Sequence, residues 1–169
     1  MSSDILRTRF VLYVENQPVN VLLMEAIFQR RPNYQLVVAN DGASGLEAAR
    51  GFKADLLLLD IGLPDCRGTE LLCRIRKLPG WKTVPAVAVT AKHGFDLDGT
   101  TFAERWAKPM DIRQALHDLD RLLLTSVPPL ARVKPARTPA PVYLARARGP
   151  HARILTRVVE SIPFAAQHG

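Results

Sequence analysis

The sequence of 169 residues contains only two cysteines, Cys66 and Cys73. Two thiols are too few for a disulfide framework, and their spacing fits no metal-binding motif. No run approaches the roughly 20 apolar residues of a membrane-spanning helix. The first residues also lack the apolar core and cleavage site of a signal peptide. These absences argue against a disulfide-rich secreted protein or a membrane protein, and we expect a cytoplasmic protein with reduced thiols.

Positive charge is concentrated in the last quarter of the chain. Residues 126–169 contain seven basic residues and one acidic residue, and so carry most of the formal net charge of +7. Residues 1–125 are nearly neutral. The basic character of the whole chain therefore says little about its main body.

The first 125 residues alternate between apolar runs rich in β-branched residues and segments with helical spacing. Strands are predicted at 9–15, 35–39, 56–60, 84–91 and 104–107, and helices beginning near Pro18, Asp41, Gly68 and Asp111. This alternation predicts an α/β fold with a doubly wound, five-stranded parallel sheet. Residues 92–103 have weak patterning, so the helix between the last two strands is expected to be short or missing.

Polar residues follow the predicted strands at the points where the strands end. The unbroken run Leu56–Leu59 leads into Asp60, the first strand leads into Glu15 and Asn16, and Thr90 and Lys108 end the last two strands. The carboxyl ends of parallel strands share one edge of a sheet, and ligands bind beyond that edge. We therefore expect these side chains to meet around Asp60.

Composition changes after the last predicted helix, which suggests three parts: a domain at 1–125, a Pro/Ala/Arg-rich linker at 126–150, and a basic tail at 151–169. Residues 151–162 have the pattern of a short amphipathic helix, which would need a partner surface or the body itself. The segment is too short and proline-rich for a helix-turn-helix domain. Nucleic-acid binding is therefore not expected of the body, and only the basic tail could support it, through salt-dependent contacts.

Four short motifs together resemble one family. They are YVENQPVN at 13–20, LLLLDIGLPDCRG at 56–68, AVAVTA at 86–91 and AKP at 107–109. In this order, each at a predicted strand end, they resemble the receiver domain of two-component response regulators and hybrid histidine kinases. The resemblance covers about 115 residues and implies a flavodoxin-like receiver fold.

The resemblance implies phosphoryl transfer from a histidine of a kinase or phosphotransfer protein. Asp60 would be the nucleophile that becomes aspartyl phosphate. Lys108 would pair with the phosphoryl oxygens as a point charge, and Thr90 would donate a hydroxyl hydrogen bond to them. A cis bond before Pro109 is common in the family. Any catalytic activity would be at most autophosphatase activity.

The resemblance also implies a Mg²⁺ site. Its protein ligands would be Glu15, Asn16, Asp60 and the carbonyl oxygen of Gly62. The family usually has two acidic residues where this chain has Glu15 and Asn16. An amide carries no charge, so we expect weakened metal affinity.

Two other departures concern signalling. The family's switch aromatic lies three residues before the lysine, where this chain has Arg105, with Trp106 beside it. The segment before that strand is also shorter than usual. Two hypotheses follow. One is a stand-alone receiver in a phosphorelay, which acts by contact with a downstream protein or serves as a phosphate relay or sink. The other is a pseudo-receiver that binds proteins without phosphorylation.

Overall fold

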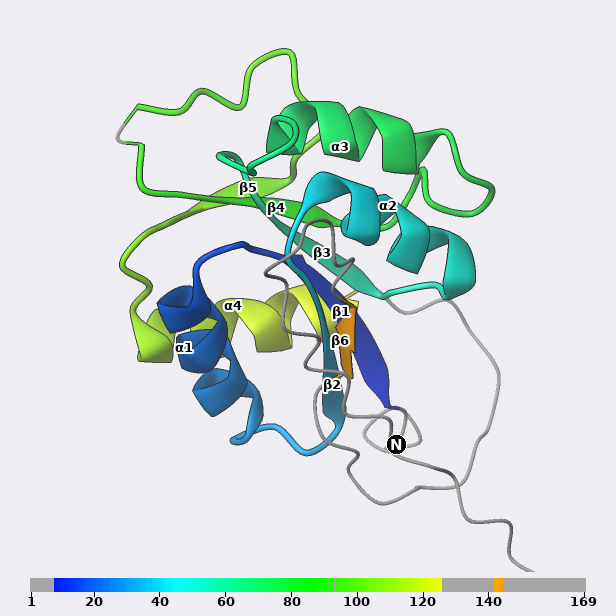
Figure 1. Cartoon of the computed structure of the whole chain (residues 1–169). Helices are drawn as coiled ribbons and strands as arrows, with labels where there is room; N and C mark the ends of the chain where they lie inside the picture. The colour runs from blue at the N-terminus through cyan, green and yellow to red at the C-terminus, as the bar shows by residue number, and fades with distance from the viewer. Residues whose placement is uncertain (1–7, 93, 126–141, 145–169) are drawn as a thin grey trace, which may run out of the picture.

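The computed structural model describes residues 8–92, 94–125 and 142–144. They form a six-stranded sheet in the order β5-β4-β3-β1-β2-β6, in which every neighbouring pair is parallel (Figure 1). The order of the first five strands is that of a doubly wound fold with its switch point between β1 and β3. The predicted fold class and the five-stranded receiver sheet are therefore confirmed.

The strands are short and mostly buried on both faces, as their continuous apolar runs predict. They are β1 (Arg9–Val14), β2 (Tyr34–Ala39), β3 (Leu56–Asp60), β4 (Ala86–Thr90), β5 (Glu104–Ala107) and β6 (Val142–Leu144). All five residues of β3 are buried, Asp60 included.

Within the described residues, four helices cover the sheet: α1 (Pro18–Phe28), α2 (Gly42–Gly51), α3 (Gly68–Arg76) and α4 (Ile112–Thr125). Helices α1 and α4 lie on one face, and α2 and α3 lie on the other (Figure 1). Each face has its own apolar core, one centred on Met24 and Leu119, the other on Leu57 and Leu72. Two cores separated by the sheet are expected when helices alternate between its faces.

No helix connects β4 and β5 in the described residues 91, 92 and 94–103. This agrees with the expectation of a short or missing helix. Within this segment Phe95 and Phe102 contact each other edge to face, with ring centroids 6.5 Å apart, and Phe102 is buried in the core beneath α3.

The sixth strand lies within the segment predicted to be a linker. Val142–Leu144 pairs with Val37–Ala39 and extends the sheet at β2. The chain between 126 and 141, the rest of the predicted linker, and the helix predicted at 151–162 lie outside the described residues. The tripartite division of the chain therefore remains a prediction.

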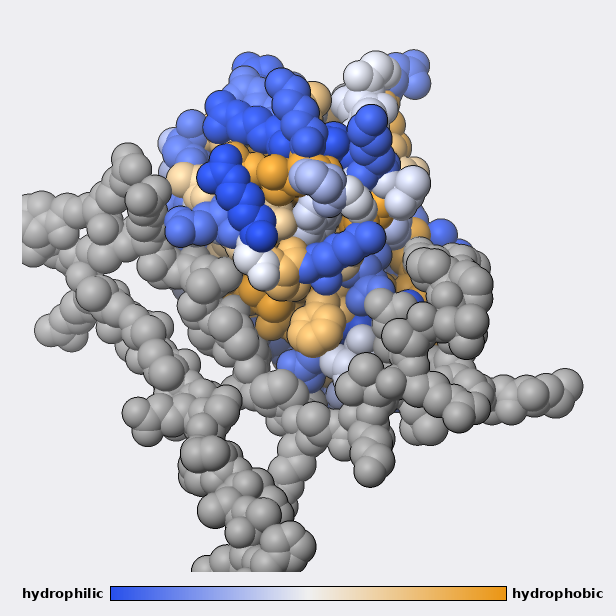
Figure 2. All heavy atoms as spheres, turned by 90° about the vertical axis from the view of Figure 1, so that its right-hand side faces the viewer, coloured by the Kyte–Doolittle hydropathy of each residue, from blue (hydrophilic) through white to orange (hydrophobic). Residues whose placement is uncertain are grey.

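The surface view in Figure 2 shows a face on which hydrophilic side chains surround smaller apolar areas. None of the helices in the described part of the chain is long and apolar enough to cross a membrane.

Candidate functional site

The site lies at the carboxyl edge of the sheet, where β3 ends at Asp60. The backbone N–H of Ile61 donates to the carbonyl of Val89 on β4, and Gly62 donates its N–H to Asp60 Oδ1 at 3.0 Å. These bonds fix the carboxylate at the mouth of the loop. A Cβ on Gly68 would lie 2.3 Å from the Asp60 carbonyl oxygen, so only glycine allows the loop to close there.

Lys108 reaches this carboxylate from the end of β5. Its Nζ lies 2.9 Å from Asp60 Oδ2 and also contacts Glu15 Oε2. The side chains of Glu15, Asp60 and Lys108 are 0%, 10% and 11% exposed. Carboxylates this deeply buried require a paired cation, and one ammonium here serves both of them. The Lys108–Pro109 bond is cis, as the resemblance implied.

Glu15 is held by more donors than Lys108 alone. Its Oε2 accepts the Tyr13 hydroxyl at 3.1 Å and the Asn20 amide at 3.2 Å, and its Oε1 accepts the Gln17 backbone N–H at 3.0 Å. Burial, with the nearby charges and the hydrogen bond to Glu15, raises the pKa of Tyr13 far above its usual value. The hydroxyl therefore remains a protonated donor.

The sequence interpretation did not identify Tyr13 or Asn20 as site residues. The signal in the sequence that could have identified them is their spacing from Glu15. Tyr13 and Glu15 are two residues apart along a strand, so their side chains point to the same side of the sheet. Asn20 lies in the first turns of α1, which begins directly after the strand end.

Thr90 ends β4 beside this group and is 5% exposed. Its hydroxyl oxygen accepts the backbone N–H of Lys92 at 3.1 Å, and its carbonyl accepts the N–H of Lys108 at 2.9 Å. The hydroxyl hydrogen is thus left to donate. The predicted catalytic residues Asp60, Thr90 and Lys108 all end adjacent strands at this edge.

The predicted metal ligands offer only oxygen donors, which is the chemistry that Mg²⁺ prefers. Two are carboxylates, one is the amide of the half-buried Asn16, and one is the backbone carbonyl of Gly62. No group of three or more His, Cys, Asp or Glu side chains that could hold a metal ion occurs in the part of the chain that the structure describes. The donor set fits Mg²⁺ in kind, with one negative charge fewer than a three-carboxylate site would have.

Asp65 lies in the loop after β3 and stabilises the start of the neighbouring helix α2. Its carboxylate accepts the backbone N–H groups of Gly42 and Ala43 at 2.7 and 2.9 Å, which lowers the pKa of Asp65 against the effect of its partial burial. Asp41, predicted as a possible cap, accepts the N–H of Ser44 at 2.6 Å. These contacts tie the loop after β3 to the start of α2.

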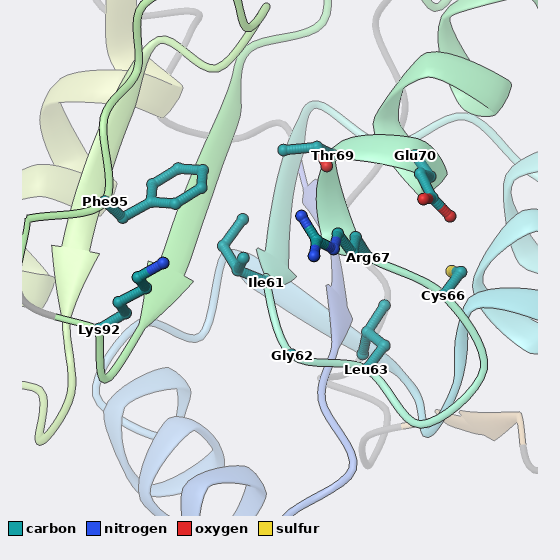
Figure 3. Close-up of a pocket in the computed structure, with 9 residues that line it drawn as sticks. All are labelled: Ile61, Gly62, Leu63, Cys66, Arg67, Thr69, Glu70, Lys92 and Phe95. Carbon is teal, nitrogen blue, oxygen red and sulfur yellow. The ribbon is translucent and has the colours of Figure 1, made fainter.

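A hollow of about 460 Å³ adjoins the site between the loop after β3 and the segment after β4 (Figure 3). The side chains of Arg67 and Lys92 extend into it from the two sides. Its lining is completed by Ile61, Gly62, Leu63, Cys66, Thr69, Glu70 and Phe95. The missing helix leaves Phe95 as part of its wall.

The two residues that replace the usual switch position point in different directions. Arg105 is exposed and donates to the carbonyl of Phe95 at 3.1 Å. Trp106 is 7% exposed and packs in the core with Met110 and Leu119. The indole is therefore a core side chain on the face covered by α1 and α4.

The sequence model described as the response regulator receiver domain matches residues 11–103, more than half of the chain. The transcriptional regulatory protein KdpE of Mycobacterium tuberculosis is 34% identical over 82 residues, which cover 48% of this chain and 34% of that protein. The histidine-protein kinase BarA of Escherichia coli is 30% identical over 114 residues, 64% of this chain and 12% of the kinase. The chain thus spans about a third or less of the length of these two curated relatives.

Solved structures agree. The receiver domain of a Pseudomonas aeruginosa sensor histidine kinase, with magnesium coordinated in its active-site cleft, is 26% identical with a TM-score of 0.61, over 68% of this chain and 97% of that one. The Vibrio cholerae chemotaxis protein CheY4 has the same fold, with a TM-score of 0.64 at 21% identity, over 69% of this chain and 99% of that one. With the motifs at the strand ends, these findings show that the chain belongs to the response regulator receiver domain family of two-component systems.

Proposed function

We propose that this receiver domain accepts a phosphoryl group on Asp60 from a phosphohistidine of a histidine kinase or a histidine phosphotransfer protein. The main support for this proposal is the ion pair between the Asp60 carboxylate and Lys108 Nζ, 2.9 Å apart at the carboxyl end of the buried strand β3. Output is contact with a downstream protein. The proposal includes a cytoplasmic location, where such kinases draw on ATP.

In the proposed step a carboxylate oxygen of Asp60 attacks phosphorus and forms an acyl phosphate. The phosphorus–nitrogen bond of phosphohistidine breaks, and its electron pair stays on the imidazole nitrogen. Lys108 compensates the negative charge that gathers on the phosphoryl oxygens, and Thr90 donates its hydroxyl hydrogen to them. Thr90 is the last residue of β4, the neighbour of β3. Lys108 directly follows β5, the next strand beyond β4.

Mg²⁺ belongs to the proposal because two carboxylates and a phosphoryl group repel one another. When bound, it would supply charge neutralisation for the attacking and transferred oxygens. Asp60, Glu15, Asn16 and the Gly62 carbonyl would hold it. Because Asn16 is uncharged, we expect weaker binding than with aspartate at this position.

The test is intact-mass spectrometry of the full chain with Mg²⁺ and acetyl phosphate. We expect one phosphoryl adduct on the wild type and none on Asp60→Asn, which keeps the shape of the side chain. An adduct that survives in Asp60→Asn would refute Asp60 as the acceptor.

A second candidate is a pseudo-receiver that binds proteins without phosphorylation. It is favoured by Asn16 in the acidic pocket and by Arg105, which is bonded to the loop at Phe95 instead of supplying an aromatic switch. In the same experiment, no adduct on the wild type but one on Asn16→Asp would establish this alternative. Equal labelling of both proteins would exclude it.

A further inference from the structure

Glu15 lies at the centre of a hydrogen-bonded group that the receiver chemistry does not itself require. Four donors converge on its carboxylate: the Tyr13 hydroxyl, the Gln17 backbone N–H, the Asn20 amide and the Lys108 ammonium. A carboxylate has about four lone-pair positions. The four donors match that number but are divided unevenly, because Oε1 accepts only the Gln17 N–H.

Three of these four donors share one oxygen, Oε2. This is also the oxygen that faces Lys108, and Lys108 in turn contacts Asp60. The Tyr13 hydroxyl approaches it from within the sheet, since both Tyr13 and Glu15 are 0% exposed. The dipole of this buried hydroxyl therefore acts on the carboxylate through a medium of low dielectric constant.

From these contacts we infer that Tyr13 is a positioning residue: it holds the Glu15 carboxylate in its ion pair with Lys108 and weakens the attraction of Glu15 for a divalent cation. The donated hydrogen draws negative potential away from Oε2, and it holds the carboxylate in the orientation that meets the ammonium. This inference rests on the proposed function for the role of Lys108, but its test does not require phosphoryl transfer.

Removal of the hydroxyl alone separates this role from packing. Tyr13→Phe keeps the ring within the core formed with α1 and α4 and deletes one donor to Glu15. The electrostatic potential at Oε2 then becomes more negative. This strengthens the attraction of a doubly charged cation more than that of the singly charged lysine. We expect Mg²⁺ to bind Tyr13→Phe about three- to tenfold more tightly than the wild type, a fraction of the full effect of a hydrogen bond to a charged group.

The chain supplies a matched control in Tyr34, whose hydroxyl donates to the carboxylate of Asp120 at 2.9 Å in another part of the molecule. Tyr34→Phe deletes the same chemical group from the same kind of bond. It should leave Mg²⁺ affinity unchanged. Asn20→Ala, which removes another donor to Oε2, should act in the same direction as Tyr13→Phe.

The measurement is isothermal titration of the full-length chain with Mg²⁺ alone, on the wild type, on each variant, and on Tyr13→Phe in a Glu15→Gln background. Thermal unfolding of each protein establishes that it is folded. Tighter binding in Tyr13→Phe that vanishes in the Glu15→Gln background supports the inference. Unchanged or weaker binding, an equal gain in Tyr34→Phe, or a gain that persists without the Glu15 carboxylate overturns it.

Two further outcomes separate this inference from the proposed function. If Mg²⁺ affinity shifts as expected and the wild type takes no phosphoryl group, the phosphoacceptor role fails and the role of Tyr13 stands. If the wild type is labelled on Asp60 and the affinities do not shift, the phosphoacceptor role stands and the role of Tyr13 fails.

Discussion

A carboxylate, a tyrosine hydroxyl and a basic side chain meet at two places in this molecule. At the site, Glu15 accepts a hydrogen bond from Tyr13 and pairs with Lys108. On the opposite flank, Asp120 of α4 accepts one from Tyr34 and pairs with Arg31, which follows α1. In each place a carboxylate is held between a tyrosine hydroxyl and a cation.

Burial and the choice of cation distinguish the two places. The Arg31 and Asp120 side chains are 35% and 32% exposed, and the guanidinium grips both carboxylate oxygens, at 2.9 Å to Oδ1 and 2.6 Å to Oδ2. That geometry fixes α4 against the end of α1. Glu15 is fully buried and meets a flexible lysine, which can follow a second anion. The first arrangement stabilises a contact between helices, while the second holds the cation that the proposed phosphoryl transfer would use.

The largest expected effect comes from removing the buried cation. Lys108→Met leaves Glu15 and Asp60 close together without a counter-charge, and we expect a loss of about 3 kcal/mol in the free energy of unfolding. Urea denaturation at pH 7 measures it. Arg31→Met breaks the more exposed pair and should cost only about 1 kcal/mol. Equal losses in the two variants would contradict the distinction by burial.

Acid should weaken the half-buried ion pair at Asp120. The hydrogen bond from Arg31 lowers the pKa of this carboxyl, and Tyr34 adds to the shift. A group whose pKa is lowered on folding contributes stability above its unfolded pKa of about 4, and the contribution is lost as pH falls through the folded value. Asp120→Asn should therefore be less stable than the wild type at pH 6, and the difference should shrink below pH 4. Urea midpoints across this range measure it, and a constant difference would count against the ion pair.

The smallest expected effect is a difference in pKa between Tyr34 and Tyr13, which titration of the two hydroxyls can measure. Burial, with the hydrogen bond to Asp120, raises the pKa of Tyr34 to about 12, and Tyr13 is shifted further. Ultraviolet absorbance of tyrosinate should show a step near pH 12 that is absent from Tyr34→Phe and retained in Tyr13→Phe. The raised pKa also means that stability from Tyr34 is full below pH 10 and is lost as pH rises through 12. A step near pH 12 that disappears in Tyr13→Phe would reverse the assignment.

Most of the fold could be predicted from the sequence because its signals are local. The run Leu56–Leu59 ending in Asp60 is a buried strand in the structure, and Pro18 and Asp41 mark helix starts as predicted. Parallel alternation then forces the strand ends to one edge, so the proximity of Asp60 and Lys108 follows from topology.

The features that were not predicted depend on side-chain direction and on pairing over long distances. Alternation allows Tyr13 and Glu15 to meet but does not require the hydroxyl to reach the carboxylate. Trp106 could have replaced the family's aromatic beside Arg105, and only packing shows that it lies in the core. The strand at Val142–Leu144 lies in a region of linker-like composition, and its pairing with β2 has no local signal.

That late strand has a consequence for synthesis of the protein. Val37 and Val142 are paired across more than a hundred residues of chain. Every residue of the five-stranded sheet leaves the ribosome before β6 does, and at about 5–20 residues per second the delay after β5 lasts a few seconds. During that interval the edge of β2 has unpaired backbone groups next to an apolar run. An exposed edge of this kind can pair with a strand of another chain. Pairing of β6 with β2 thus covers a strand edge that the newly made chain leaves exposed.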